Sequence, residues 1–556
     1  MFVKRSWNTK EKNPHYQHHI VESYRDPKTG TSKHKYLINI SQLPMHVIDA
    51  IALSLKQGET VTGPKVNIDV GDSLRGAGVL AIHRMWKKTN MDRTLKGLTD
   101  EQKKSVQLMV TQRILQPGSK LSLQSTLRDT IFKEAWSNKR FDEDELYDVM
   151  DELHKNFYTI QESLRKNTDD QPVMLLYDIT STYFEGTKAE EGEYGYSRDK
   201  RWDRYQIVIG LVCTEEGLPL AIEVWPGNTT DKTTVIERVN TLKERFGITK
   251  AIFVGDGGMY TEANIEEIVA NGFDYILKPE WHTQKKQLEK QLPLQKSLFE
   301  SNGVEWIEDG VRYVGYYSLP RKERSARQRE EGMRRAENEL QKLSHTAAKG
   351  RYYSWTRLRE KINEILKCCG VTELFKAHIE SLEADANPEQ KARLELAFEK
   401  DPNAIAMQEA IDGMYILETS LDSEKYSPEY IEASYKKLQG VERAFRNIKS
   451  FLGIRPVYHY KRRRVRAHVL ICFLGYYLLK MIELECRRHD ITQEIAPLLR
   501  DWDKLQLVSL SITTGEHSCS EWQWSLGEIG EGIKEQIESV GWWKSIDRYR
   551  RSLLKQ

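Results

Sequence analysis

Three acidic residues stand out by position as candidates for chemistry on a substrate. Asp178 ends an apolar run that predicts a strand, and Asp256 ends a second such run and is followed by two glycines. The end of a strand presents its side chain at the rim of a sheet, and glycines there let backbone or substrate come close. An aspartate in either place is also a common turn former or helix cap, so neither identifies a site by itself.

The third acid, Glu442, lies in a helix predicted over residues 427–452, between a Ser-Pro start and a glycine stop. It stands at the edge of the apolar stripe, so we expect a half-buried carboxylate. Tyr435, Glu442 and Lys449 follow one another at intervals of seven residues and therefore share one helix face. Taken alone, this helix favours a solvated face on which Glu442 pairs with Arg446.

The same residues resemble the signature Y-(2)-R-(3)-E-(6)-K of DDE transposases of bacterial insertion sequences, in the group called the IS-four superfamily. Tyr435, Glu442 and Lys449 match, and Leu438 stands at the arginine position. The DNA contact made by that arginine would then be absent, or supplied by Lys436, Lys437 or Arg446. Other short motifs of one branch of this superfamily occur over about residues 170–480, in the same order as in that family. They are YDITSTYF from Tyr177, GN at 227–228, GDGGM from Gly255 and RPVYH from Arg455.

The resemblance implies an RNase H-like core in which Asp178, Asp256 and Glu442 hold two divalent cations, Mg²⁺ or in its place Mn²⁺. Carboxylate oxygens suit these hard ions, and two ions about 4 Å apart can hold both oxygens of an in-line phosphoryl transfer. Water would cut the strand at the element's end, and the liberated 3′-hydroxyl would attack target DNA. Two alternatives stay open: a metal-dependent nuclease without strand transfer, and a DNA-binding derivative without catalysis.

Cations must hold double-stranded DNA against these acids, although 84 Lys and Arg nearly balance 82 Asp and Glu. The partners expected are terminal inverted repeats and target DNA. We expect contacts from the signature face, at Tyr435, Arg446 and Lys449. An acid-free cluster after the signature helix supplies the others: Lys461, Arg462, Arg463, Arg464 and Arg466. A second basic cluster, over residues 321–335, contains glutamates and is interpreted as a solvated helix face.

The elements that must position these residues predict an α/β fold class. Strand-like runs occur at residues 173–177, 205–213, 218–225, 252–254, 275–277 and 414–417, with a helix predicted over 231–246. We assign residues 169–280 and 411–490 to the RNase H-like core, a mixed sheet with flanking helices. Residues 281–410 would be an insertion of a hairpin, over 304–319, and helices.

The remaining segments flank this core. Residues 1–65 predict a small β element containing one hairpin, and residues 66–168 an α-helical domain with helices from Asp72, over 100–115 and over 142–164. By analogy with the family, this domain would bind the DNA ends. Residues 491–556 are predicted to be a C-terminal helical region for assembly or DNA contact. Because two ends must be brought together, we expect a homodimer as the working form.

Composition limits the class of protein. The chain has 556 residues, of which 39% are hydrophobic and 30% charged, as expected of a soluble protein of several domains. Its longest apolar run, residues 469–479, is too short to span a membrane and predicts a core helix. Without the apolar core of a signal peptide, we expect a cytoplasmic protein of a bacterial or archaeal cell, nucleoid-associated when bound. Six cysteines without a CxxC pair predict reduced, buried thiols.

Overall fold

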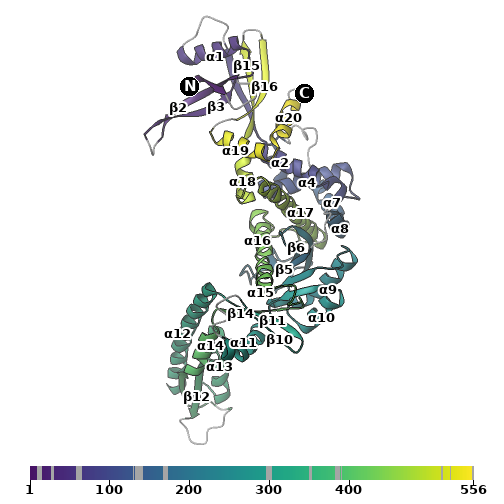
Figure 1. Cartoon of the computed structure of the whole chain (residues 1–556). Helices are drawn as coiled ribbons and strands as arrows, with labels where there is room; N and C mark the ends of the chain where they lie inside the picture. Colours follow the sequence, from purple (N-terminus) through teal and green to yellow (C-terminus); the bar gives the residue numbers. More distant parts are fainter. Residues whose placement is uncertain are drawn as a thin grey trace. The chain divides into compact units, whose positions relative to one another are not determined.

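The computed structural model forms two compact units, labelled by element in Figure 1. The first comprises Met1–Thr230, Thr241–Ile248 and Gln439–Gln556, and the second Asp231–Asn240 and Thr249–Leu438. No helix of the described part is long and apolar enough to cross a membrane. The described residues are 1–8, 15–26, 30–57, 66–128, 130–131, 142–166, 173–295, 303–349, 353–381, 389, 391–514, 517–525 and 528–553.

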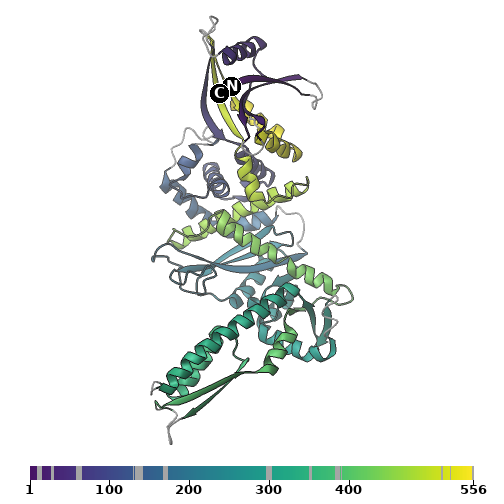
Figure 2. The ribbon, with the colours of Figure 1, turned by 90° about the vertical axis from the view of Figure 1, so that its left-hand side faces the viewer.

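Two small antiparallel sheets of the first unit come from the ends of the chain. One has the strand order β1-β2-β3, with helix α1 packed against β1, and contains the predicted hairpin as β2 and β3. The other has the order β16-β15-β4, so strands from opposite ends of the chain pair directly, as Figures 1 and 2 show. The elements are β1 (Phe2–Asn8), β2 (His15–Arg25), β3 (Ser32–Asn39), α1 (Met45–Gln57), β4 (Val66–Arg75), β15 (Gln506–Thr514) and β16 (His517–Trp524).

The second of these sheets corrects two predictions. The helix expected from Asp72 begins only at Ala77, because Asp72 belongs to β4. The C-terminal region expected to be helical is helical only in part, because it also contains β15 and β16. The backbone groups of β4 and β15 satisfy one another across more than 400 residues, and a local pattern cannot show such a pairing.

Helix α17 lies at the centre of the helices of the first unit. It packs against α2, α4, α7, α8 and α18, and residues 469–479 are buried, which confirms the predicted core helix. The helix predicted over residues 100–115 has these bounds and is capped by Thr99 and Gln102. The helices are α2 (Ala77–Lys88), α3 (Met91–Thr94), α4 (Asp100–Leu115), α5 (Leu123–Arg128), α7 (Glu143–Lys155), α8 (Phe157–Lys166), α17 (Arg462–Arg487), α18 (Ile495–Trp502), α19 (Glu528–Ser539) and α20 (Trp543–Leu553).

Three further strands of the first unit pair antiparallel in the order β5-β6-β7. β6 and β7 lie where strands were predicted, whereas β5 extends beyond the predicted residue 177. Almost all residues of the three strands are buried, as in a sheet covered on both faces. Helix α16 packs against β5 and β6 and continues into the π-helix η2. The elements are β5 (Met174–Tyr183), β6 (Gln206–Thr214), β7 (Pro219–Pro226), α16 (Gln439–Arg446) and η2 (Asn447–Phe451).

Within the second unit, strands follow one another in the order β10-β11-β14-β9-β8. The pair β8 and β9 is parallel and the other pairs are antiparallel, so the sheet is mixed. The hairpin predicted over residues 304–319 is present as β10 and β11. The elements are β8 (Ile252–Gly255), the 3₁₀ turn η1 (Gly257–Met259), α10 (Glu262–Ala270), β9 (Asp274–Leu277), α11 (Trp281–Gln295), β10 (Val304–Glu308), β11 (Val311–Tyr317), β14 (Met414–Thr419) and α15 (Pro428–Lys436). Helix α9 (Asp231–Glu244) contributes residues to each unit.

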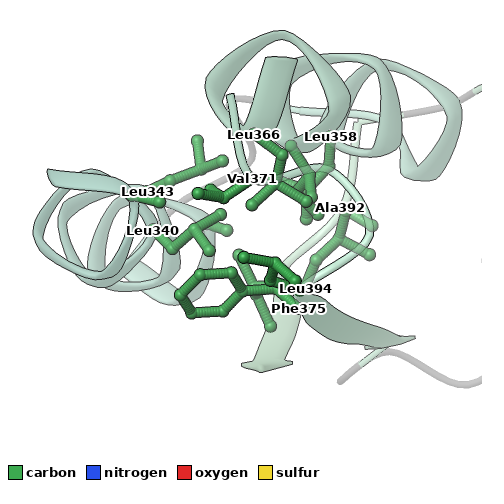
Figure 3. Packing of buried hydrophobic residues seen from close by; sticks show 13 residues of the cluster. Leu340, Leu343, Leu358, Leu366, Val371, Phe375, Ala392 and Leu394 are labelled. Atoms are coloured by element: carbon green, nitrogen blue, oxygen red, sulfur yellow. The ribbon is translucent and has the colours of Figure 1, made fainter. Parts of the chain in front are cut away.

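Between β11 and β14 the second unit carries two helices packed on a hairpin. Figure 3 shows their shared core, in which Leu340, Leu358 and Leu366 meet Phe375 and Leu394. Figure 2 shows the long helix α12 beside the hairpin strands, and α12 packs against β13. The elements are α12 (Leu319–Lys349), α13 (Trp355–Cys369), β12 (Phe375–Ser381), β13 (Leu394–Lys400) and α14 (Pro402–Ile411). The sequence predicted helices here but not the hairpin of β12 and β13.

The mixed α/β class is therefore confirmed, and the prediction for the cysteines is correct only in part. Cys213, Cys472 and Cys486 are buried free thiols, whereas Cys368 is exposed and Cys369 half-buried. These two residues end α13 just before its C-cap, Gly370, which has a left-handed backbone conformation (φ 71°). A last helical turn is covered on fewer sides than a helix interior, which explains the exposure. The side chain of Cys519 lies outside the described part of the chain.

Candidate active site

Asp178 lies in the middle of β5, not at its end. The strand continues to Tyr183, because residues 178–183 pair in register with β6 and Asp178 stands opposite Leu211. The side chain is half-buried between buried neighbours, and its Oδ1 accepts a hydrogen bond from the Ile179 N–H at 2.7 Å. The prediction that Asp178 ends the strand is wrong by about half the strand's length, because the Thr-rich continuation is a good strand former.

Glu442 lies on α16, which packs against β5, so the structure brings the elements of Asp178 and Glu442 together within the first unit. The helix predicted over residues 427–452 is divided instead into α15, α16 and η2, with a break at Lys437 and Leu438. Glu442 is exposed, not half-buried, because Val441 and Phe445 occupy the buried face. Within the described residues, no ion pair joins Glu442 to Arg446, so the solvated pair is not seen.

Asp256 directly follows β8, as predicted, and caps the short turn η1. Its Oδ1 accepts a hydrogen bond from the Gly258 N–H at 3.1 Å, so the capping role common for such aspartates is present. A Cβ on Gly255 would meet Met259 Sδ at 3.0 Å and Leu277 Cδ2 at 3.1 Å. A larger residue at this position would therefore have to displace the side chains of Met259 and Leu277, which pack closely against the backbone that enters Asp256.

The carboxylates of Asp178, Asp256 and Glu442 fit a hard divalent cation by their chemistry. All three supply anionic oxygen, which Mg²⁺ and Mn²⁺ prefer as a ligand. Asp178 and Glu442 belong to the first unit and Asp256 to the second. Among the described residues, no three His, Cys, Asp or Glu side chains gather as a metal site.

Tyr435, Glu442 and Lys449 were predicted to share one helix face, but they lie on α15, α16 and η2. Lys449 is buried and bound to a carboxylate that the sequence analysis did not single out. Its Nζ lies 2.9 Å from Asp199 Oδ1, and Arg455 binds the same oxygen. The side chains of Lys449 and Asp199 are only 10% and 6% exposed. Burial lowers the pKa of Lys449, although the Asp199 charge opposes that shift. Asp199 could have been noticed only as an acid inside a basic run, since its two partners are some 250 residues away.

The basic cluster after the signature helix is acid-free in sequence but not in space. Elements of the first unit supply carboxylates: Asp151 binds Arg463 and Arg464, and Glu191 binds Arg462 and Arg466. The 461–466 segment opens α17, whose first N–H groups lack partners within the helix. The N–H of Arg462 donates to Glu190 Oε2 at 2.7 Å, which satisfies one of these groups. Arg466 also reaches Glu223 and is 11% exposed.

The remaining predicted contact residues differ in exposure. Arg446 is exposed on α16, and Tyr435 is half-buried near the end of α15, in the second unit. Lys461 is the N-cap residue of α17, and its ammonium lies 5.9 Å from the ring centre of Tyr460. Among the cluster, the side chains of Arg462 and Arg463 are 59% and 48% exposed. These two side chains remain about half exposed to solvent despite their ion pairs.

Comparison with known proteins adds a family. No curated protein matches the chain. Among solved structures, a cryo-EM structure of a piggyBac transposase synaptic complex with hairpin DNA is similar at 11% identity, with 76% of each chain covered and a TM-score of 0.35. The model of the transposase DDE domain matches residues 170–478, more than half of the chain. This stretch holds all three acids, and the chain belongs to the family of transposases with a DDE domain.

Proposed function

We propose that the protein cleaves the ends of an insertion sequence and joins the 3′-hydroxyl ends to target DNA. The main support is the match to the transposase DDE domain model, which covers Asp178, Asp256 and Glu442. The packing of α16 on β5 supports it, since it brings the elements of two of these acids into contact. The spacing of Tyr435, Glu442 and Lys449 further supports the IS-four group and its RNase H-like core.

In this proposal, Asp178, Asp256 and Glu442 would hold two Mg²⁺ or Mn²⁺ ions. When bound, such ions supply positive charge that stabilises the negative charge developing on the phosphoryl oxygens. Asp178 is suited to a fixed position, because β5 pairs with β6 through it. Glu442 is exposed on a short helix and can adjust its side chain to the substrate. The proposal requires the carboxylate of Asp256, in the second unit, to bind the same ions as those of Asp178 and Glu442.

Double-stranded DNA is the proposed partner, both as terminal inverted repeats and as target. The most accessible predicted contacts are Arg446, Arg462 and Arg463, which are exposed cations of the first unit. Lys449 is a weaker candidate for direct contact, because Asp199 already binds its ammonium in a buried place. A homodimer remains the proposed working form, since joining needs two element ends at once.

The proposal predicts a specific effect of Glu442→Gln, which keeps the shape of the side chain and removes its charge. The wild type should nick and join a labelled duplex carrying the terminal repeat in the presence of Mg²⁺. Glu442→Gln should bind the duplex with unchanged affinity and lose cleavage and joining by at least ~10³-fold. Glu424→Gln is the matched control, because Glu424 is an exposed glutamate in the turn before α15.

Two outcomes would favour the alternatives. Hydrolysis without any joined product, even with supplied 3′-hydroxyl ends, would identify a nuclease without strand transfer. Binding by both proteins, with no cutting under either Mg²⁺ or Mn²⁺, would identify a DNA-binding derivative. Equal activity of the wild type and Glu442→Gln would contradict the assignment of this acid.

A further inference from the structure

The second unit contains a groove lined by cationic side chains. Its volume is about 630 Å³, within the range of ligand-binding clefts. Its walls are α12, the last turn of α13, the segment from the end of α14 into β14, and the start of α11. The five cationic residues that line it are Arg321, Arg324, Arg329, Arg335 and Lys367.

Packing of the helices fixes the shape of this groove. A Cβ on Gly332 of α12 would lie 2.6 Å from the Cys369 carbonyl oxygen, so only glycine lets the two helices approach this closely. The apolar core in Figure 3 joins the same two helices. At the start of β14, the Gly413 carbonyl accepts a hydrogen bond from the Ser318 N–H at 2.8 Å, just before α12. The walls are therefore a built surface.

Arg329 is the buried base of the groove. Its guanidinium binds Asp412 and lies 3.4 Å from Glu409, and its side chain is 6% exposed. Its Nε is buried and has no hydrogen-bond partner among the described residues. A buried donor without a partner is costly, and an anionic oxygen in the groove is the kind of group that would satisfy it.

The other cationic side chains of the groove have few carboxylate partners within the protein. Arg335 lies 3.9 Å from Glu331, the limit of an ion pair, and Arg321 stacks on the Tyr415 ring at 4.5 Å. Within the described part of the chain, Arg324 and Lys367 have no carboxylate partner. Five cations thus face two carboxylates, those of Glu331 and Asp412.

The spacing of these cations favours an extended anion. Arg321, Arg324 and Arg335 lie on one face of α12, with Gln328 and Glu331 between them. At 1.5 Å per residue, the first and last are separated by about 21 Å along the helix axis. That length corresponds to about six base pairs of B-DNA at roughly 3.4 Å per pair. A single phosphate could satisfy only one end of such a row.

We propose that this groove binds the phosphate backbone of DNA, as a second contact surface in addition to the acids. The inference rests on the proposed function for the identity of the polyanion. It also divides the basic cluster over residues 321–335 in two. Arg321, Arg324, Arg329 and Arg335 face the groove, whereas the exposed Arg327 and Arg334 of the same helix do not line it.

The division provides a matched pair of double variants with equal loss of charge on one helix. The groove variant is Arg324→Gln with Arg335→Gln, and the control is Arg327→Gln with Arg334→Gln. Binding of a 30-base-pair duplex is measured without divalent metal over a range of salt concentrations. The groove variant should bind about 10-fold more weakly and lower the salt slope by about 2, while the control stays within about 2-fold.

Cys368 provides a readout inside the groove, because it is exposed and lines the wall. Its alkylation by N-ethylmaleimide is followed by mass spectrometry of its peptide, with buried Cys213 as the internal reference. Bound duplex should slow the modification of Cys368 at least 5-fold in the wild type and not in the groove variant. Inorganic polyphosphate without nucleic acid is the second arm of the experiment.

Each result decides the inference. Equal weakening in both double variants, or no protection of Cys368 by duplex, would overturn it. Protection by polyphosphate but not by duplex would show a small-anion site instead and overturn the DNA assignment. Since neither readout uses catalysis, protection by duplex without any cutting would leave the groove standing while the proposed function fails. Cutting and joining without protection of Cys368 would support the proposed function and overturn the groove as a DNA-binding surface.

Discussion

At the scale of single residues, Asp199 is the least expected finding. It binds Lys449 and Arg455 at once, in a place that leaves its side chain 6% exposed. Its Oδ2 is buried without a hydrogen-bond partner among the described residues. A buried carboxylate between two cations holds the segment after η2 to the loop before β6. The lysine of the signature face thus has a structural role, whatever its part in DNA contact.

Removing the charge of Asp199 should destabilise the protein. Asp199→Asn leaves the Lys449 ammonium buried without its counter-ion, a change that costs about 3 kcal/mol in comparable buried pairs. We expect the first thermal transition to shift down by several degrees, measured by differential scanning fluorimetry. The control is Asp203→Asn, whose exposed carboxylate pairs with Arg201 at the surface, and it should leave the transition nearly unchanged. Equal shifts would contradict the structural role of Asp199.

At the scale of elements, α4 and α17 gather positive charge around one histidine. His459 packs edge-on against Tyr147, with ring centres 5.9 Å apart, and beside His468 at 5.4 Å. Burial, together with the charges of Lys120, Arg113 and Arg464, lowers the pKa of His459 to about 3. Burial lowers the pKa of His468 as well. Both histidines are therefore neutral in the folded protein near neutral pH.

These shifts predict acid destabilisation. Because the folded pKa of His459 is depressed, the unfolded chain binds the extra proton first, so stability is full above about pH 6.5 and is lost as pH falls toward 3. The thermal midpoint should fall between pH 7 and 5, and His459→Gln should flatten that slope. His378→Gln, at an exposed position of β12, is the control and should keep the wild-type slope. A variant slope equal to the wild type at position 459 would refute the effect.

At the scale of the whole molecule, the predicted acids belong to two compact units: Asp178 and Glu442 to one and Asp256 to the other. The domain match runs through both units, from residue 170 to residue 478. The proposed function therefore makes one reaction depend on both parts of the chain. Residues 281–410, predicted as an insertion, contain most of the residues that line the cationic groove and most of the second unit.

Because the proposed reaction uses acids of both units, the losses of cleavage activity in single and double variants should not be additive. Asp178→Asn and Asp256→Asn should each reduce single-turnover cleavage by at least ~10³-fold, and the double variant should be no worse than either. Groups that act as one unit fail together, because removing one member already removes their joint effect. Losses that multiply would indicate that the two acids act independently. Glu424→Gln is again the control, because it removes the charge of an exposed carboxylate outside the proposed site.

Local patterns in the sequence were enough to predict the elements that depend on near neighbours along the chain. The strand runs of β6 and β7, the helix over residues 100–115 with its Thr99 cap, and the core helix of residues 469–479 were all predictable from periodicity and capping. The words around Asp178, Asp256 and Glu442 likewise pointed to the DDE family that the domain match shows. These features depend on neighbours within a few turns, so a one-dimensional pattern contains them.

Features that depend on partners distant in sequence became visible only in the folded structure. Strand β4 was mistaken for part of a helix because its partner, β15, lies more than 400 residues away. The arginines at the start of α17 form an acid-free cluster in the sequence, but in the structure Asp151 and Glu191 form ion pairs with them. The basic residues of α12 divided into two faces once α13 and β14 closed one side. Burial and charge pairing are properties of space, and folding alone brings such residues within the few ångströms over which they act.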